Sequence, residues 1–267
     1  MNRIEERFAR LKKDGQKGFI VYIGAGDPNL DLTRRLAVEF DRIGIDVLEL
    51  GVPFSDPLAD GPVNQLAAQR GLESGTTPAK VLQTVAAIRR ESQIPIVLYL
   101  YFNLIHRQGL EPFVRDAAAA GVDGLLALDL PPEESGNYEA VMARAGLSAI
   151  YLVAPTTPET RLELIVRRGS GFIYYVSREG VTGMQTSVSE TIGAMTAKIR
   201  ARTTLPVAVG FGISTPEQAA LVARSADAVV VGSAVVHQIA AHGGSAGLVE
   251  RVSRFTSALV AAVKEKR

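Results

Sequence analysis

The segment VLELGVPFSDPLADGP, residues 47–62, carries two carboxylates in unusual positions. Glu49 interrupts an apolar run that we predict to be a buried strand, where an ionisable side chain is costly unless it is paired or its proton is used. Asp60 follows on a loop stiffened by three prolines. No Lys, Arg or His lies between Asp46 and Gln69, so neither acid has a cationic neighbour in the sequence. We therefore predict that Glu49 and Asp60 are a catalytic acid/base pair.

A structural interpretation of the same two acids stays open. In that interpretation, the loop carboxylate caps a helix and the strand carboxylate pairs with a distant cation. We favour the catalytic interpretation because strand interiors seldom hold lone acids.

The strand that contains Glu49 is one of a series of short apolar runs rich in β-branched residues. We predict eight strands, at residues 18–23, 46–50, 94–100, 124–128, 149–153, 171–176, 206–209 and 226–231. Helical patterns follow them, at residues 32–43, 78–92, 111–120, 133–145, 158–168, 189–202, 216–225 and 247–264. Eight strand–helix units favour a closed (β/α)8 TIM barrel over an open doubly wound sheet, which would usually need fewer strands or a second domain.

The ends and the composition of the chain add three expectations. Residues 3–13 are predicted to form an extra N-terminal helix that closes the barrel floor, and no linker divides residues 1–267, so we expect a single domain. The 29 basic and 28 acidic residues give a net charge of +1 without a basic stripe, which disfavours nucleic-acid binding. No apolar run reaches about 18 residues, so we expect no signal peptide and no membrane span. We therefore expect a cytoplasmic protein.

Glycine-rich segments follow the last three predicted strands, and in barrels of this kind the chemistry lies at the carboxyl ends of the strands. They are GVTG at residues 180–183, GFGIS at 210–214 and GS at 232–233. Glycines let the backbone approach an anion closely, and Ser233 begins a helix whose first N–H groups can point at it. We predict a phosphate site at Gly183, Gly212, Gly232 and Ser233, with ordinary helix-entry turns as the alternative.

Other catalytic groups are scarce. The three histidines, His106, His237 and His242, lie away from the ends of predicted strands, so no metal site is expected with the two acids. Every lysine lies in a terminus or a predicted helix, which disfavours a Schiff base, and the absence of cysteine excludes a thiol nucleophile. The remaining groups suit proton transfer on a substrate whose own ring accepts the electrons.

Residues 49–62 closely resemble the characteristic motif of the tryptophan synthase alpha chain family. Further segments match this family in unbroken order from residue 8 to the last helix. They are GDP at 26–28, Tyr101 with Asn103, DLP at 129–131, SR at 177–178 followed by GVTG, GFGIS at 210–214 and GSA at 232–234. The resemblance implies a lyase of tryptophan biosynthesis that cleaves indole-3-glycerol phosphate to indole and glyceraldehyde 3-phosphate, a retro-aldol reaction.

The resemblance also implies roles for individual residues. Glu49 would move a proton between indole C3 and the hydroxyl beside the ring, a task that suits the raised pKa of a desolvated carboxyl. Asp60 would accept the indole N–H. The indole pocket would be lined by Tyr22, Asn64, Leu126, Leu128, Tyr174 and Phe211, although the barrel core is an equal alternative for the two leucines. Residues 178–189 would form a lid that carries Thr182.

A partner protein is implied as well. The family resemblance predicts a tryptophan synthase beta subunit in an alpha2beta2 complex, with pyridoxal phosphate on the beta subunit and no cofactor on this chain. The expected interface residues are Pro53, Asp56, Pro57, Asn103, Asp129 and Pro131. Two positions depart from the usual family pattern, because Asn64 replaces an aliphatic residue and Tyr22 a phenylalanine. Two alternatives stay open, a stand-alone lyase that releases free indole and a chain that mainly binds and activates the beta subunit.

Overall fold

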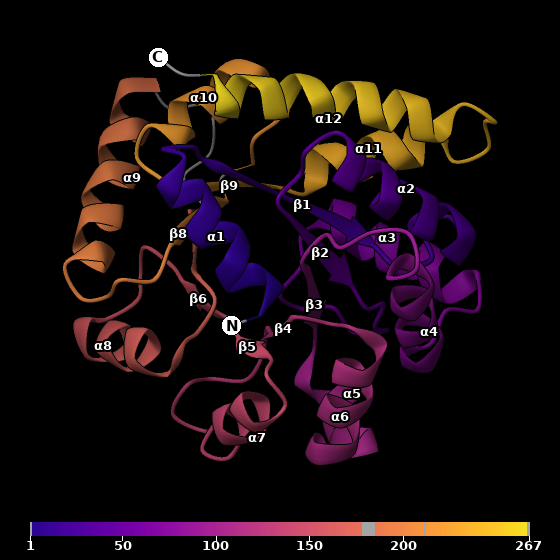
Figure 1. Ribbon diagram of the computed structural model, residues 1–267, viewed down its shortest axis with the longest axis horizontal. Helices are drawn as coiled ribbons and strands as arrows, with labels where there is room; N and C mark the ends of the chain where they lie inside the picture. The colour runs from indigo at the N-terminus through magenta and orange to yellow at the C-terminus, as the bar shows by residue number, and fades with distance from the viewer. Residues whose placement is uncertain (1, 178–184, 211, 266–267) are drawn as a thin grey trace.

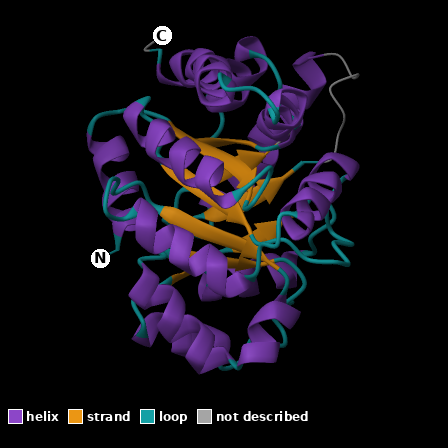
Figure 2. Cartoon of the chain, turned by 90° about the vertical axis from the view of Figure 1, so that its right-hand side faces the viewer, coloured by secondary structure: helices purple, strands orange, loops and turns teal. Residues whose placement is uncertain are grey.

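The computed structural model describes residues 2–177, 185–210 and 212–265 of the chain. Nine parallel strands form one sheet, namely β1 (Gly18–Gly24), β2 (Val47–Gly51), β3 (Ile96–Leu100), β4 (Gly124–Ala127), β5 (Ser148–Ala149), β6 (Tyr151–Val153), β7 (Ile173–Val176), β8 (Val207–Gly210) and β9 (Ala228–Val231). Their order is β5-β4-β3-β2-β1-β9-β8-β7-β6. The sheet curls into a nearly closed barrel inside a ring of helices (Figures 1 and 2), which confirms the predicted barrel.

All eight predicted strands are present to within a few residues, but the fifth is divided. It was predicted at residues 149–153 and is interrupted at Ile150, so that it appears as β5 and β6. β5 pairs with β4, whereas β6 pairs with β7. The two short strands therefore occupy one position in the barrel wall, and each pairs with a different neighbouring strand.

Helices surround the barrel, most of them outside its wall (Figure 1). They are α1 (Arg3–Lys13), α2 (Leu30–Arg42), α3 (Pro62–Glu73), α4 (Pro78–Ile88), α5 (Phe102–Gln108), α6 (Leu110–Ala120), α7 (Tyr138–Arg144), α8 (Glu159–Arg168), α9 (Gln185–Arg200), α10 (Pro216–Ala223), α11 (Ser233–His242) and α12 (Leu248–Lys264). The helix predicted from residue 133 begins only at Tyr138, because the intervening Ser, Gly and Asn residues favour turns. Along the described ranges, no helix combines the length and the apolar character needed to cross a membrane.

Alternating strand residues supply two cores. One set packs beneath the outer helices, and the other points into the barrel, where Val47, Val97 and Leu126 belong to one buried cluster. Leu126 is fully buried there and does not line the cavity described below, which corrects its predicted place in the ligand pocket. Leu128 points to the same side but lies two residues, or roughly 7 Å, closer to the carboxyl end of the strand. Leu128 reaches the cavity for that reason.

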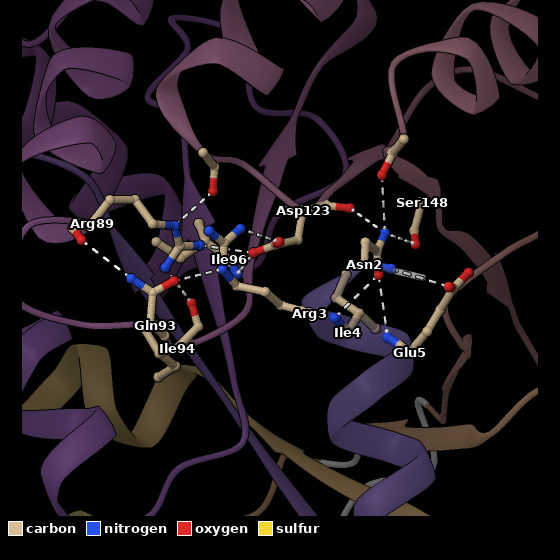
Figure 3. Close-up of polar contacts among 12 residues, drawn as sticks. Asn2, Arg3, Ile4, Glu5, Arg89, Gln93, Ile94, Ile96, Asp123 and Ser148 are labelled. Carbon is tan, nitrogen blue, oxygen red and sulfur yellow. Dashed lines mark hydrogen bonds and ion pairs between the residues drawn. The ribbon is translucent and has the colours of Figure 1, made fainter.

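The N-terminal helix α1 closes the floor of the barrel, as expected (Figure 3). Its capping residue Asn2 donates from Nδ2 to the Asp123 carbonyl oxygen at 3.0 Å and to the Ser148 hydroxyl at 2.8 Å. Arg3 of α1 and Arg89 from the end of α4 each form an ion pair with the Asp123 carboxylate, at 2.9 and 2.7 Å. These contacts join α1 to the amino ends of neighbouring strands.

Carboxylates recur at this floor, where Asp46 and Asp123 are buried and Asp227 is half-buried. Each accepts a backbone N–H from the start of the adjacent strand at 2.8 to 2.9 Å. The acceptors are Asp46, Asp123 and Asp227, and their respective donors are Phe19, Ile96 and Val207. These polar groups at the floor therefore stabilise the fold. The functional site is expected at the carboxyl ends of the strands.

Candidate active site

A cavity of about 720 Å³ opens at the carboxyl ends of the strands. It brings together eight of the residues predicted from the sequence, namely Tyr22, Glu49, Asn64, Leu128, Tyr174, Gly212, Gly232 and Ser233. These residues come from both halves of the chain and from opposite sides of the barrel. Thr182, Gly183 and Phe211 lie outside the described residues.

Glu49 supplies a buried carboxyl group to this cavity. Its side chain points into the barrel from β2, and the residue is 1% exposed. Neither carboxylate oxygen has a hydrogen-bond partner among the described residues. Burial therefore raises the pKa of Glu49 to about 8, because desolvation disfavours the charged form. At neutral pH this group can hold a proton and also release it, as a group that both donates and accepts must.

Two glycines at strand ends make room for tyrosine rings around Glu49. A Cβ at Gly51 would lie 2.4 Å from the hydroxyl oxygen of Tyr22, and a Cβ at Gly210 would lie 2.7 Å from that of Tyr174. Side chains at these glycines would displace the rings that line the cavity. Gly210 therefore makes room for the adjacent Tyr174 ring.

Asp60 is hydrogen-bonded by two neutral phenols rather than by a cation. The Tyr99 hydroxyl donates to Oδ1 at 2.9 Å, and the Tyr101 hydroxyl donates to Oδ2 at 2.8 Å. Burial and the nearby Asp60 carboxylate raise the pKa of both phenols, so each remains protonated and can donate. The two tyrosines are separated by one residue on and just beyond β3, and residues two apart share a face of a strand. That spacing could have revealed them in the sequence.

Tyr101 also holds the loop that carries Asp60. Its hydroxyl oxygen accepts the Ala59 N–H at 2.9 Å, and its ring stacks on Phe54 with centroids 5.2 Å apart. Side-chain contacts from the barrel wall therefore act together with the prolines to position this loop.

Another part of the cavity wall presents backbone donors. Gly232 is the N-cap of α11 and has no side-chain cap, so the first N–H groups of the helix remain available to a ligand. Gly212 has φ +53°, a conformation that favours glycine, and an added Cβ there would meet no atom within 4 Å. Among the described residues that line the cavity, none is Lys or Arg. An anion at this side would be bound by backbone N–H groups and hydroxyls.

Besides Glu49, two other side chains in the cavity have a buried oxygen without a hydrogen-bond partner among the described residues. They are Asn64, through its buried Oδ1, and Ser177, through its hydroxyl. Ser177 lies directly after β7, and both its place at a predicted strand end and the SR pair at 177–178 indicated it in the sequence. Both atoms can bond to a ligand that enters the cavity.

The residues predicted to contact a partner differ in exposure. Asp56, Asn103 and Asp129 are exposed, and Pro57 and Pro131 are half-buried. Pro53 is buried and offers no surface, which corrects its inclusion. Asp129 has a local role as well, because its Oδ1 accepts the Phe102 N–H at the start of α5 at 2.6 Å.

Comparison with known proteins places this site in a family. The family model described as tryptophan synthase alpha chain matches residues 8–264. The chain belongs to the tryptophan synthase alpha chain family. The alpha chain of Geotalea daltonii is 51% identical over 263 residues, which are 98% of this chain and 99% of that protein. The alpha chain of Opitutus terrae is 53% identical over 245 residues, 92% of each chain.

Solved structures of the family have the same fold. The tryptophan synthase alpha subunit of Legionella pneumophila superposes with a TM-score of 0.91 at 37% identity and with 98% of each chain covered. An open form of tryptophan synthase from Mycobacterium tuberculosis gives a TM-score of 0.88 at 31% identity, again with 98% of each chain covered. The alpha chain family consists of lyases whose reaction is the retro-aldol cleavage of indole-3-glycerol phosphate, and this chain is an enzyme of that family.

Proposed function

We propose that the cavity at the carboxyl ends of the strands is where indole-3-glycerol phosphate is bound and cleaved. The observation that carries this proposal is the buried Glu49 carboxyl, whose two oxygens lack partners among the described residues and face the same cavity as the N-terminus of α11. A proton-transfer group and a separate backbone anion site in one cavity match a substrate with an aromatic ring at one end and a phosphate at the other.

Glu49 carries the proton in this scheme. Protonated Glu49 gives its proton to indole C3, which turns the ring into an indolenium cation. The resulting carboxylate then takes the proton of the hydroxyl beside the ring. As the bond between C3 and the side chain breaks, its electrons return to the ring and the carbon that bore the hydroxyl becomes the aldehyde of glyceraldehyde 3-phosphate. The net change moves one proton from the hydroxyl to C3.

Asp60 stabilises the positive charge that appears on the ring. Its carboxylate accepts the N–H of the indole, and this bond strengthens when the ring becomes a cation. The two tyrosine hydroxyls occupy part of the accepting capacity of the carboxylate, which has about four lone-pair sites. Sites therefore remain for the substrate.

The remaining cavity residues divide into a group that would contact the indole ring and a group that would bind the phosphate. The indole ring would contact Tyr22, Asn64, Leu128 and Tyr174, with Phe211 added by the family resemblance. The phosphate would accept from Gly212, Gly232 and Ser233, with Gly183 added in the same way and Thr182 on the lid. Release of indole from indole-3-glycerol phosphate tests the scheme, and a folded chain without this activity both alone and with a beta chain would contradict it.

A beta subunit is proposed as the partner that consumes the indole. The Mycobacterium tuberculosis neighbours are structures of tryptophan synthase, which supports a complex of this kind. Asp56, Pro57, Asn103, Asp129 and Pro131 would face the beta subunit in a cytoplasmic alpha2beta2 assembly, with pyridoxal phosphate on that subunit. Indole release measured with and without a beta chain separates this function from a stand-alone lyase, because high activity without a beta chain supports the latter.

A crystal soaked with glycerol 3-phosphate should show the phosphate against the backbone N–H groups of Gly212, Gly232 and Ser233. We expect this position because α11 begins there without a side-chain cap and helix N-termini attract anions. Difference electron density is the measurement. Phosphate density beside surface lysines, with none at α11, would contradict the proposed phosphate site.

Replacing Asn64 with Ile should tighten binding of the indole moiety. The substitution removes an amide whose Oδ1 is buried without a partner and should gain on the order of 1 kcal/mol, or several-fold in affinity. The inhibition constants of indolepropanol phosphate and glycerol phosphate are compared in the wild type and the variant. Only the indole-bearing ligand should change. An equal change in both ligands, or in neither, would show that Asn64 does not contact the ring.

A further inference from the structure

We propose that Tyr99 is a positioning residue, whose hydroxyl fixes the Asp60 carboxylate in the orientation that accepts the indole N–H. The inference rests on the proposed role of Asp60. Tyr99 has no part in the proton transfers described above, although it lines the cavity that contains Glu49 and donates a hydrogen bond to Asp60.

Two phenol donors hold the two oxygens of Asp60 separately. Tyr99 donates to Oδ1 at 2.9 Å and Tyr101 donates to Oδ2 at 2.8 Å. Hydrogen bonds to a carboxylate are roughly twice as strong as those between neutral groups. A carboxylate bonded through one oxygen can still turn about that bond, whereas bonds to both oxygens set the plane of the group. Two donors therefore determine where its remaining lone pairs point.

The two tyrosines have different supports. Tyr101 lies just beyond the end of β3 and is held by the loop, because its ring stacks on Phe54 and its hydroxyl oxygen accepts the Ala59 N–H. Tyr99 belongs to the barrel wall, where it lies on β3 opposite Gly51 of β2 in the parallel register. Of the two hydroxyls, the one from Tyr99 thus ties the loop acid directly to the wall that carries Glu49.

The Tyr99 ring is itself held in place. It packs edge-on against the Tyr22 ring, with centroids 4.9 Å apart and an interplanar angle of 67°. Tyr22 pairs in register with Glu49 and occupies the space that the glycine at position 51 leaves open. Asp60, Tyr99 and Tyr22 consequently form one chain of contacts that ends beside Glu49. This chain sets the position of the loop acid relative to the buried acid, as a reaction that needs both on one ring requires.

A positioning role and a merely structural role have different consequences for ligands. Loss of the Tyr99 hydroxyl should matter for a ligand that offers an N–H to Asp60, and should hardly matter for one that does not. Indolepropanol phosphate offers the N–H. Its benzothiophene counterpart has the same shape and phosphate, with sulfur in place of the N–H.

The experiment measures the dissociation constants of these two ligands in the wild type, Tyr99→Phe, Asp60→Asn and the double variant. Phe keeps the ring that packs on Tyr22 and removes only the hydroxyl. Tyr99→Phe should weaken indolepropanol phosphate about 10-fold, the usual effect of one hydrogen bond to a charged group. The benzothiophene ligand should change less than about 2-fold. In the Asp60→Asn background the Tyr99→Phe change should have almost no further effect, because Tyr99 acts through Asp60.

Tyr151→Phe is the matched control. It also removes a tyrosine hydroxyl that donates to a carboxylate, that of Glu139, and neither residue lines the cavity. This variant should bind both ligands like the wild type. Equal weakening of both ligands by Tyr99→Phe, or full additivity with Asp60→Asn, would overturn the positioning role. If Asp60→Asn itself fails to weaken indolepropanol phosphate relative to the benzothiophene ligand, the proposed role of Asp60 falls first.

Discussion

Glu49→Gln should lower the rate of indole-3-glycerol phosphate cleavage by about 10²–10⁴-fold, the usual cost of losing a positioned acid/base group. The amide fills the same space in the barrel but can neither give a proton to indole C3 nor take one from the substrate hydroxyl. Indole release under saturating substrate is the measurement. Glu163→Gln, a change of the same kind on the exposed face of α8, is the control and should keep full activity.

Glu49→Gln should also alter the dependence of the folding stability on pH. Burial raises the pKa of Glu49 from its usual value of 4.5 to about 8, so the folded state holds a proton that the unfolded chain releases between these values. Stability from this group is therefore greatest below pH 4.5 and falls by about 1.4 kcal/mol per pH unit until pH reaches the folded pKa. Gln has no such dependence.

Urea unfolding at pH 5 and pH 8 measures this difference. The free energy of unfolding of Glu49→Gln, relative to the wild type, should rise between the two pH values by a few kcal/mol, because other titrating groups are common to both proteins. Near-full turnover by Glu49→Gln would contradict the catalytic role. An unchanged stability difference would instead show that the carboxyl is solvated.

Asp60→Asn should lower the cleavage rate by at least about 100-fold, comparable to the loss of a group that stabilises transition-state charge. The amide oxygen can still accept the indole N–H, but the negative charge that balances the indolenium cation is gone. The amide group would also disturb the two tyrosine contacts, since only one of its two terminal atoms accepts a hydrogen bond.

The Asp60→Asn prediction is checked by the kcat for cleavage, with phosphate binding as an internal reference. Glycerol phosphate should bind as in the wild type, because Gly232 and Ser233 line the cavity whereas Asp60 is not among its lining residues. Asp116→Asn, on the outer helix α6, is the matched control and should be fully active. A normal kcat for Asp60→Asn would mean that the charge on the ring is stabilised elsewhere.

The sequence by itself determined the barrel, because hydrophobic periodicity is a local property. Short apolar runs rich in β-branched residues indicated the positions of the strands. The helix predicted at residues 3–13 has the same bounds as α1. Glu49 could be identified for a related reason. A carboxylate within an apolar strand is costly to bury. This conflict between the residue and its apolar neighbours can be recognised without knowledge of the fold.

Only the tertiary structure showed how Asp60 is held. Its partners Tyr99 and Tyr101 lie 39 and 41 residues away along the chain, and they meet it because the loop after β2 folds over the end of β3. Absence of a nearby cation in the sequence was therefore no guide to pairing, since neutral phenols supplied the donors.

The position of a side chain along the barrel axis likewise depends on the three-dimensional structure. Leu126 and Leu128 share a face of one strand, yet only Leu128 reaches the cavity. The glycines at positions 51 and 210 follow the same principle, because the need for a missing side chain comes from a tyrosine ring on an adjacent strand. Periodicity specifies the face on which a side chain lies, whereas its height in the barrel and its neighbours across the wall depend on strand register, which is set by contacts between segments far apart in sequence.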